Sequence, residues 1–185
     1  MYICFKFNIS KKMRKLYWFT GQAGAGKTEL ATMLKKHLIR EQTILNQNNE
    51  YNGLTGSLIP NKKFVIIDGD DIRALYNNSD YSIEGRKKNV DFVQNLCVFL
   101  MRNNITPIVC MVSPFALQRR FFIEEYKGIE IFVHCNEIRG RENFHVDYYE
   151  PPLIDFKHGI ESDTTNNTIS ESFNILIENL CKITL

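Results

Sequence analysis

Short apolar runs alternate with stretches of helical periodicity along most of the chain. Continuous runs rich in β-branched and aromatic residues are typical of strands buried on both faces, whereas apolar positions three or four residues apart indicate helices. Four strands are predicted at 16–19, 64–67, 105–112 and 129–133, and helices at 27–40, 83–101, 115–126 and 170–182. A fifth strand is expected between Leu153 and Glu161. The pattern predicts an α/β fold in which a mostly parallel five-stranded sheet carries helices on both faces.

Cap and turn residues set the expected boundaries of these elements. Ser113-Pro114 is expected to begin a helix, because serine is a good N-cap and proline fits the first helical position. Thr168 and Glu171 have the spacing of a capping box at the start of the last helix. Residues 42–62 are polar, rich in asparagine and contain glycine and proline, so they are predicted to form an inserted loop.

Length and charge limit the domain count and the class of partner. With 185 residues, the chain is expected to form a single domain over residues 15–185. Residues 1–14 are expected to be an N-terminal extension or, through Tyr2-Ile3-Cys4-Phe5, an additional edge strand. The chain has 23 basic and 21 acidic residues, a net charge of +2. Such a balance gives no general attraction to a nucleic acid polymer or a membrane, and neither is expected as a partner.

Cysteine and histidine positions argue against a structural metal or a disulfide framework. The five cysteines and four histidines are scattered without the spacing of metal ligands. An odd number of cysteines, several of them in apolar runs, fits buried thiols in a reducing compartment. No stretch approaches the roughly 20 apolar residues that a membrane-spanning helix needs. We therefore expect a cytoplasmic protein.

The most specific motif follows the first predicted strand. Residues 21–28 read Gly-Gln-Ala-Gly-Ala-Gly-Lys-Thr and match the phosphate-binding loop G-x-x-x-x-G-K-[ST], with a helical stretch directly after it. The glycines of such a loop aim backbone N–H groups at phosphate oxygens, and the helix N-terminus adds positive potential. Lys27 is expected to reach the β- and γ-phosphates of ATP, and the Thr28 hydroxyl to bind Mg²⁺. The ATP-binding residues are predicted to be Gly21, Gln22, Ala23, Gly24, Ala25, Gly26, Lys27 and Thr28.

Polar residues that follow other predicted strands are expected to face the same cleft, because ligands of open parallel sheets bind beyond the carboxyl ends of the strands. Asp68 and Asp70 follow a buried strand; one can hold Mg²⁺, and the other can accept the proton of an attacking hydroxyl. Arg73 lies one helical turn after Asp70, so its guanidinium group can face the same cleft. Tyr81 is a candidate to stack on a base, and Arg86 a candidate to bind phosphate or sulfate.

Five motifs in a fixed order together resemble the adenylylsulfate (APS) kinases, which are P-loop kinases. Trp18 to Thr28 is similar to the family pattern W-L-T-G-L-S-G-A-G-K-S/T, and Asp68 to Arg73 to D-G-D-N-V/I-R. Three later segments resemble G-F-S…D-R…N-I/V, I-S-P-Y/F and F-T-G-I-D…Y-E-P-P; they are Tyr81-Ser82 with Gly85-Arg86 and Asn89-Val90, Val112 to Phe115, and Phe144 to Pro152.

The resemblance implies a P-loop kinase fold and a role for each matched residue. The family transfers a phosphoryl group from ATP to the ribose 3′-hydroxyl of APS, giving PAPS. Lys27, Asp68 and Asp70 would be catalytic, with Asp70 as the base and with Thr28 and Asp68 at the metal. The implied acceptor-binding residues are Arg73, Tyr81, Arg86, Asn89, Ser113 and Phe144, of which Tyr81 and Phe144 would sandwich the base. The family also suggests a homodimer.

One departure from the family pattern affects the expected acceptor. The family has a lysine-rich lid, K-G-L-Y-K-K-A-R, before the segment matched by Phe144, whereas this chain has only residues 136–143. Arg139 or Arg141 is expected to supply replacement charge for the phosphates. A lid excludes water and completes the grip on the substrate, so its loss points to weaker APS binding or to another acceptor. Cytidine diphosphoramidate, the acceptor of a related capsule-pathway branch, is the alternative.

Two further classes of function stay open on the sequence. One is a regulatory module that binds a nucleotide at the phosphate-binding loop but has lost catalytic turnover. The joint presence of five candidate site residues argues against it: Lys27, Thr28, Asp68, Asp70 and Arg73. A kinase of a non-nucleotide alcohol would not need the aromatic pair that stacks on a base. A G-protein is disfavoured, because Asn61-Lys62-Lys63-Phe64 lacks the aspartate of the guanine-binding motif.

Overall fold

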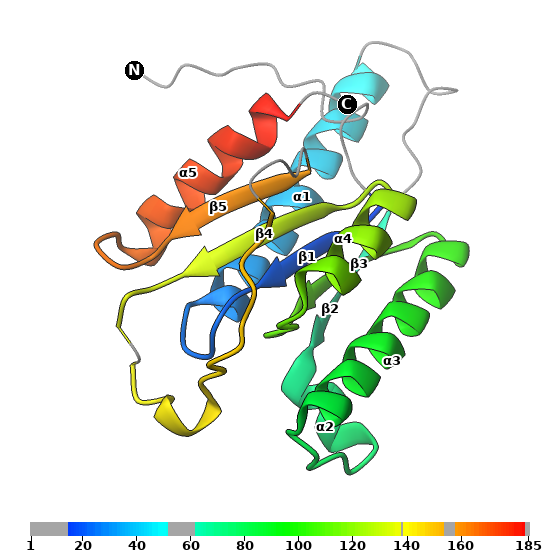
Figure 1. Ribbon diagram of the computed structural model, residues 1–185. Helices are drawn as coiled ribbons and strands as arrows, with labels where there is room; N and C mark the ends of the chain where they lie inside the picture. The colour runs from blue at the N-terminus through cyan, green and yellow to red at the C-terminus, as the bar shows by residue number, and fades with distance from the viewer. Residues whose placement is uncertain (1–14, 52–61, 138, 154–157, 184–185) are drawn as a thin grey trace.

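The computed structural model describes residues 15–51, 62–137, 139–153 and 158–183, and the possible edge strand at Tyr2–Phe5 lies outside them. One sheet has the strand order β2-β3-β1-β4-β5, and all four pairings are parallel. This sheet, with helices on both faces, confirms the predicted fold (Figure 1). The elements are β1 (Tyr17–Thr20), α1 (Lys27–Tyr51), β2 (Lys63–Asp68), α2 (Gly69–Leu75), α3 (Ile83–Arg102), β3 (Ile105–Cys110), α4 (Ala116–Glu125), β4 (Ile129–His134), β5 (Gly159–Asp163) and α5 (Ile169–Lys182).

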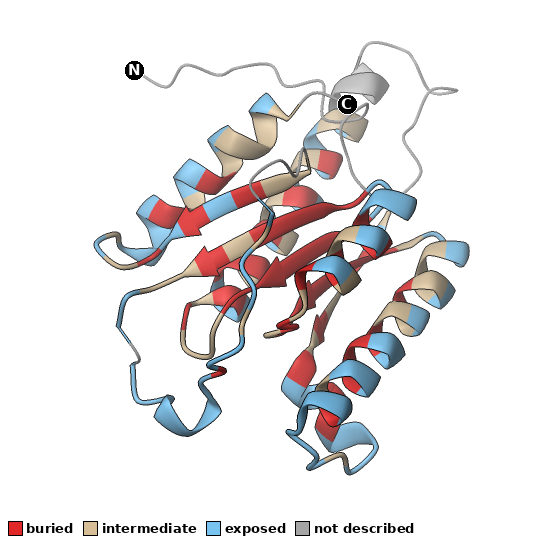
Figure 2. Ribbon diagram, in the orientation of Figure 1, coloured by how far each residue is buried: buried red, intermediate tan, exposed pale blue. Residues whose placement is uncertain are grey.

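The central strand β1 separates two hydrophobic clusters. Tyr17 and Phe19 point to the face covered by α1 and α5, while Leu16 and Trp18 point to the face covered by α2, α3 and α4. Successive side chains of a strand alternate between faces, so a run that is apolar at every position is what two covered faces require. Figure 2 shows the consequence: the central strands β3, β1 and β4 are buried over most of their length, between helices that are exposed on their outer sides. The two clusters fix the positions of the strands, whose carboxyl ends form the edge of the sheet where the candidate site lies.

The segment predicted as an inserted loop is partly helical. Helix α1 continues to Tyr51, so residues 42–51 belong to it and only 52–61 fall outside the described part. Glutamine and asparagine do not stop a helix that is already growing, because each added residue gains one hydrogen bond at little cost. The first glycine after the helix is Gly53. Gln42 is buried in this stretch, and its side-chain oxygen accepts a hydrogen bond from the Lys62 N–H at 3.1 Å.

The expected start of α4 is also wrong. The helix begins at Ala116 with Phe115 as N-cap, and Ser113 makes no cap but has a positive φ of 35°. By contrast, the capping box of Thr168 and Glu171 at α5 is confirmed. Strand β3 ends at Cys110, two residues before the predicted end, and β5 starts inside its predicted window and ends beyond it.

Candidate active site

The phosphate-binding loop joins the carboxyl end of β1 to the N-terminus of α1 (Figure 1). Gly21 has a φ of 140°, and a Cβ placed there would lie 1.9 Å from the Val133 carbonyl oxygen. No other residue fits at this position, since the neighbouring atom belongs to the backbone of β4. Gly24 and Gly26 also have positive φ, at 80° and 93°. The local sequence therefore dictates the turn that directs the chain into α1.

Lys27 lies at the base of the loop with its ammonium group turned inward. The Nζ atom donates a hydrogen bond to the Gln22 carbonyl oxygen at 2.7 Å, and the side chain is largely buried. Burial lowers the pKa of Lys27 to about 8, an effect that the nearby Cys110, Asp68 and Asp70 partly oppose. A bound phosphate would favour the charged form, because an adjacent negative charge stabilises an ammonium group.

Asp68 connects the loop to α2. Its Oδ2 accepts a hydrogen bond from the Thr28 hydroxyl at 2.8 Å, and its Oδ1 caps α2 by accepting from the Asp70 N–H at 3.0 Å. A hydroxyl and a carboxylate in contact suit Mg²⁺, which takes oxygen ligands and is commonly bound by one or two carboxylates together with substrate phosphates. The donor set thus fits the predicted metal. Asp70, on the first turn of α2, lines a cavity that Lys27, Thr28 and Asp68 also line.

The Tyr81 ring contacts two arginines that line the same cavity as Tyr81. The Arg73 guanidinium carbon lies 4.4 Å from the centre of the Tyr81 ring, and that of Arg86 lies 5.3 Å from it. Arg73 also donates to the Asp80 carbonyl oxygen at 2.8 Å, and Arg86 to the Tyr81 carbonyl oxygen at 3.1 Å. These contacts fix the turn before α3. They also place two positive charges beside an aromatic ring, as an anionic nucleotide would need.

Phe144 reaches the Tyr81 ring from a segment distant in sequence. The 3₁₀ turn Glu142–Phe144 follows β4, and the centres of the Phe144 and Tyr81 rings lie 6.1 Å apart at 64°. The Arg141 guanidinium carbon lies 5.7 Å from the Phe144 ring centre. In this edge-to-face arrangement the rings touch each other, so a base sandwiched between them would require the two rings to turn and separate.

Ser113 and Asn89 are each oriented by a neighbour. The Asn89 side-chain oxygen accepts a hydrogen bond from the Tyr76 hydroxyl at 2.6 Å. The Ser113 hydroxyl accepts from Trp18 Nε1 at 3.0 Å and lies 3.2 Å from the Thr20 hydroxyl. Both residues are buried and both line the cavity. Their positions thus depend on packing beneath the site.

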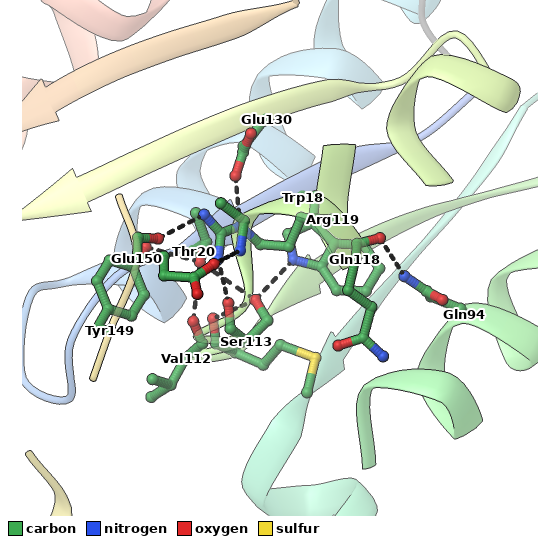
Figure 3. A network of polar contacts seen from close by, with 12 residues as sticks. Trp18, Thr20, Gln94, Val112, Ser113, Gln118, Arg119, Glu130, Tyr149 and Glu150 are labelled. Carbon is green, nitrogen blue, oxygen red and sulfur yellow. Dashed lines mark hydrogen bonds and ion pairs between the residues drawn. The ribbon is translucent and has the colours of Figure 1, made fainter. Parts of the chain in front are cut away.

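A buried arginine on α4 organises the network under Ser113 (Figure 3). Arg119 donates to the Glu130 carboxylate and to the carbonyl oxygens of Ser113 and Glu150. The Glu150 carboxylate accepts from the Ala116 N–H at 2.7 Å and so caps α4 from far along the chain. Burial raises the pKa of the Glu130 carboxyl, and the pairing with Arg119 opposes that shift. Burial also raises the pKa of Tyr149, whose hydroxyl lies 3.0 Å from that of Thr20, to about 12.

The structure brings nearly all predicted site residues to one cavity of about 490 Å³. Three predicted residues of the phosphate-binding loop do not line the cavity, namely Gly21, Gln22 and Ala25. Cys110 and Met111 line it without having been predicted, because they read as ordinary strand residues. Arg119 was missed since its partners are distant in sequence. The predicted residues in the lining are Ala23, Gly24, Gly26, Lys27, Thr28, Asp68, Asp70, Arg73, Tyr81, Arg86, Asn89, Ser113, Arg139, Arg141 and Phe144.

The described residues contain neither a cluster of metal-ligating side chains nor a membrane-spanning helix. No group of three or more histidine, cysteine, aspartate or glutamate side chains there could hold a metal ion. Nor is any helix in that part of the chain long and apolar enough to span a membrane. Among the described cysteines, Cys97, Cys110 and Cys135 are free thiols, and the first two are buried.

Comparisons with known proteins agree with the geometry. The family model for adenylylsulphate kinase matches residues 13–143. A probable adenylyl-sulfate kinase of Pyrococcus abyssi is 32% identical, over 72% of this chain and 78% of its own length. An adenylyl-sulfate kinase of Pseudomonas aeruginosa is 29% identical over 68% of this chain. The matched part covers only 54% of that relative's own length.

Solved structures share the fold. The Mycobacterium tuberculosis APS kinase in complex with AMPPNP and APS superposes with a TM-score of 0.63, at 18% identity, over 90% of this chain and 97% of that one. This likeness concerns the arrangement of strands and helices. Together with the family match over most of the chain, it shows that the chain belongs to the adenylylsulphate kinase family of ATP-dependent P-loop kinases.

Proposed function

We propose that this protein transfers the γ-phosphoryl group of ATP to the ribose 3′-hydroxyl of adenylyl sulfate. One observation carries the proposal. The lining of a single cavity includes the phosphate-binding loop with Lys27, here the ATP end, and the aromatic pair Tyr81 and Phe144 with Arg73 and Arg86, here the acceptor end. Such a cavity suits two anionic nucleotides that meet at their phosphate groups. The named relatives support APS as the second nucleotide.

At the ATP end, backbone N–H groups and Lys27 hold the phosphates in place. Thr28 and Asp68 would hold Mg²⁺, which neutralises the charge that develops on the transferred group. Asp70 accepts the proton of the attacking hydroxyl. The role is supported by the position of Asp70, which lines the cavity on the first turn of α2, the helix whose N-cap is Asp68. Little covalent chemistry is required of the protein, because positioning and electrostatic stabilisation dominate phosphoryl transfer.

At the acceptor end, Tyr81 and Phe144 turn apart from their edge-to-face contact and stack on the base. Arg73 and Arg86 hold the anionic group of the acceptor, while Asn89 and Ser113 bind its ribose. Arg139 and Arg141 contribute positive charge from the short segment that stands where the family has its lid. The Arg139 Nη2 atom donates to the Thr164 carbonyl oxygen at 2.7 Å, which fixes that side chain at the rim of the cavity. A homodimer stays a prediction that sedimentation velocity can test.

The reaction is tested by identifying the product. Purified protein, Mg²⁺ and ATP are incubated with APS or with cytidine diphosphoramidate, and the products are examined by mass spectrometry. We expect APS to gain one phosphoryl group. The cytidine compound is included because the segment 136–143 is short, and its exclusive phosphorylation would overturn APS as the acceptor. If neither nucleotide reacts, the 3′-kinase proposal fails.

An Asp70→Asn variant separates turnover from binding. The amide keeps the size of the side chain but cannot accept a proton, so turnover should fall about 100-fold or more. Binding of ATP, followed by calorimetry, should change little. A regulatory module would bind ATP equally well in both forms and show no turnover in either.

A further inference from the structure

The side chain of Gln22 does not line the cavity and instead binds another part of the chain. Its Nε2 atom donates to the Val146 carbonyl oxygen at 2.8 Å, and its Oε1 atom accepts from the Val146 N–H at 3.1 Å. Sequence position alone predicted an ATP-binding residue. Gln22 does not line the cavity, whereas Phe144, two residues before Val146, does.

The segment that carries Phe144 has little other polar attachment to the body of the protein. Its backbone hydrogen bonds are internal turns, from Phe144 to Arg141, from His145 to Glu142 and from Tyr149 to Val146. Among the described residues, the hydrogen bonds that join residues 140–148 to parts of the chain distant in sequence are the two made by Gln22. The next such bonds begin at Tyr149, whose hydroxyl lies 3.0 Å from that of Thr20. Val146 is also buried, which anchors this point further.

Glutamine is suited to this contact by its chemistry. An amide side chain offers one donor face and one acceptor face, so it can pair with both backbone groups of a single residue, as a neighbouring strand does. Leucine, which the family pattern has at this position, can do neither. Glutamate would lack the donor and would set a carboxylate oxygen against the Val146 carbonyl oxygen.

The backbone of the same residue holds the ATP end. The Gln22 carbonyl oxygen accepts hydrogen bonds from Lys27 Nζ at 2.7 Å and from the Ala25 N–H at 3.3 Å. The two halves of the cavity therefore share one residue. Its main chain shapes the phosphate-binding loop, and its side chain fixes the segment that bears Phe144.

We propose that Gln22 is a positioning residue for the acceptor nucleotide: it pins Val146 so that Phe144 is held over the cavity, and thereby partly replaces the missing lid. This assignment rests on the proposed function in so far as it concerns an acceptor. The pinning itself does not depend on which acceptor is used.

The kinetic test compares the two substrates in a Gln22→Leu variant. The substitution removes both hydrogen bonds and keeps the backbone of the loop, so the KM for APS should rise about tenfold while the KM for ATP changes less than about twofold. The matched control is Gln94→Leu. Gln94 also donates from its amide to a backbone carbonyl oxygen of another helix, that of Gln118 at 3.1 Å, but it does not line the cavity. A KM for APS that rises no more than the KM for ATP overturns the proposal.

Hydrogen exchange tests the pinning without any acceptor. Backbone amides of residues 144–149 should exchange about tenfold faster in the Gln22→Leu variant than in the wild type, while amides of β1 keep their rates. Unchanged exchange in this segment overturns the proposal. If the wild-type protein does not phosphorylate APS, the proposed function fails, and the exchange experiment still decides whether Gln22 pins the segment.

Discussion

The two ends of the cavity are built in different ways. The ATP end comes from one contiguous stretch, residues 21–28, whose backbone conformation is dictated by its own glycines. The acceptor end is assembled from α2 and α3, the Ser113 turn and the segment after β4, which are joined by side chains from elsewhere. The ATP end can be recognised from its contiguous sequence motif and tolerates little change. The acceptor end depends on long-range contacts, and changes there can alter the acceptor without loss of ATP binding.

Breaking the support beneath the acceptor end should have the largest effect on stability. An Arg119→Met substitution leaves the Glu130 carboxylate buried without its charged partner and frees the carbonyl oxygens of Ser113 and Glu150. Removal of one partner of a buried ion pair costs about 3–5 kcal/mol of unfolding free energy. Urea denaturation measures this loss. The double variant Arg119→Met with Glu130→Met should recover part of it, and a double variant no more stable than the single one would contradict the argument.

At the ATP end, the largest expected effect is on rate. A Lys27→Met substitution removes the charge that meets the phosphates and should lower kcat/KM about 1000-fold, which corresponds to about 4 kcal/mol. Stability should not fall, because the fold no longer has to bury an ammonium group whose pKa is lowered to about 8. Initial rates and a thermal unfolding curve test both parts. A large loss of stability together with the loss of activity would count against a purely electrostatic role.

The acceptor end should respond to loss of an aromatic ring with a change confined to one substrate. A Phe144→Ala substitution removes one stacking surface and should raise the KM for the acceptor about tenfold, with little change for ATP. Tyr148 provides the control, since it lies in the same segment and stacks on Phe115 without lining the cavity. Tyr148→Ala should leave both KM values near those of the wild type. Equal effects of the two substitutions would favour a non-nucleotide acceptor.

The smallest expected effect is a dependence of stability on alkaline pH. The pKa of Tyr149 is raised to about 12 by burial. In the unfolded chain a tyrosine titrates near pH 10, so above that pH the unfolded state binds fewer protons and the unfolding free energy falls as the pH rises. Urea denaturation at about pH 9 and about pH 11 measures the decline. It should be shallower in Tyr149→Phe, and parallel declines would show that other groups cause it.

Local patterns predicted the fold and most of the cavity lining, because each relevant signal is contained in a few neighbouring residues. The glycines of the phosphate-binding loop, the apolar strands and the capping box of Thr168 and Glu171 are of this kind. The composition of the Asn-rich end of α1 wrongly predicts a loop, although no helix-breaking residue occurs before Gly53. Composition alone is a weak guide where a growing helix meets no breaker.

The remaining differences come from contacts between distant residues. Ser113 has the local features of a helix cap, yet its hydroxyl is taken by Trp18 and Thr20, and the cap of α4 is supplied by Glu150. The side chain of Gln22 binds Val146 and does not line the cavity. Such pairings can be found only once the strands have brought the loops to one edge of the sheet.

The single tryptophan makes the protein its own optical reporter. Trp18 is fully buried on β1, and its indole N–H donates to the hydroxyl of Ser113 in the cavity wall. An acceptor that shifts the Ser113 turn would change the polarity and hydrogen bonding around the indole ring and thus its emission. Titration of the unlabelled protein in a fluorimeter would then follow occupancy of the acceptor end, while nucleotide bound only at residues 21–28 would leave the signal nearly constant.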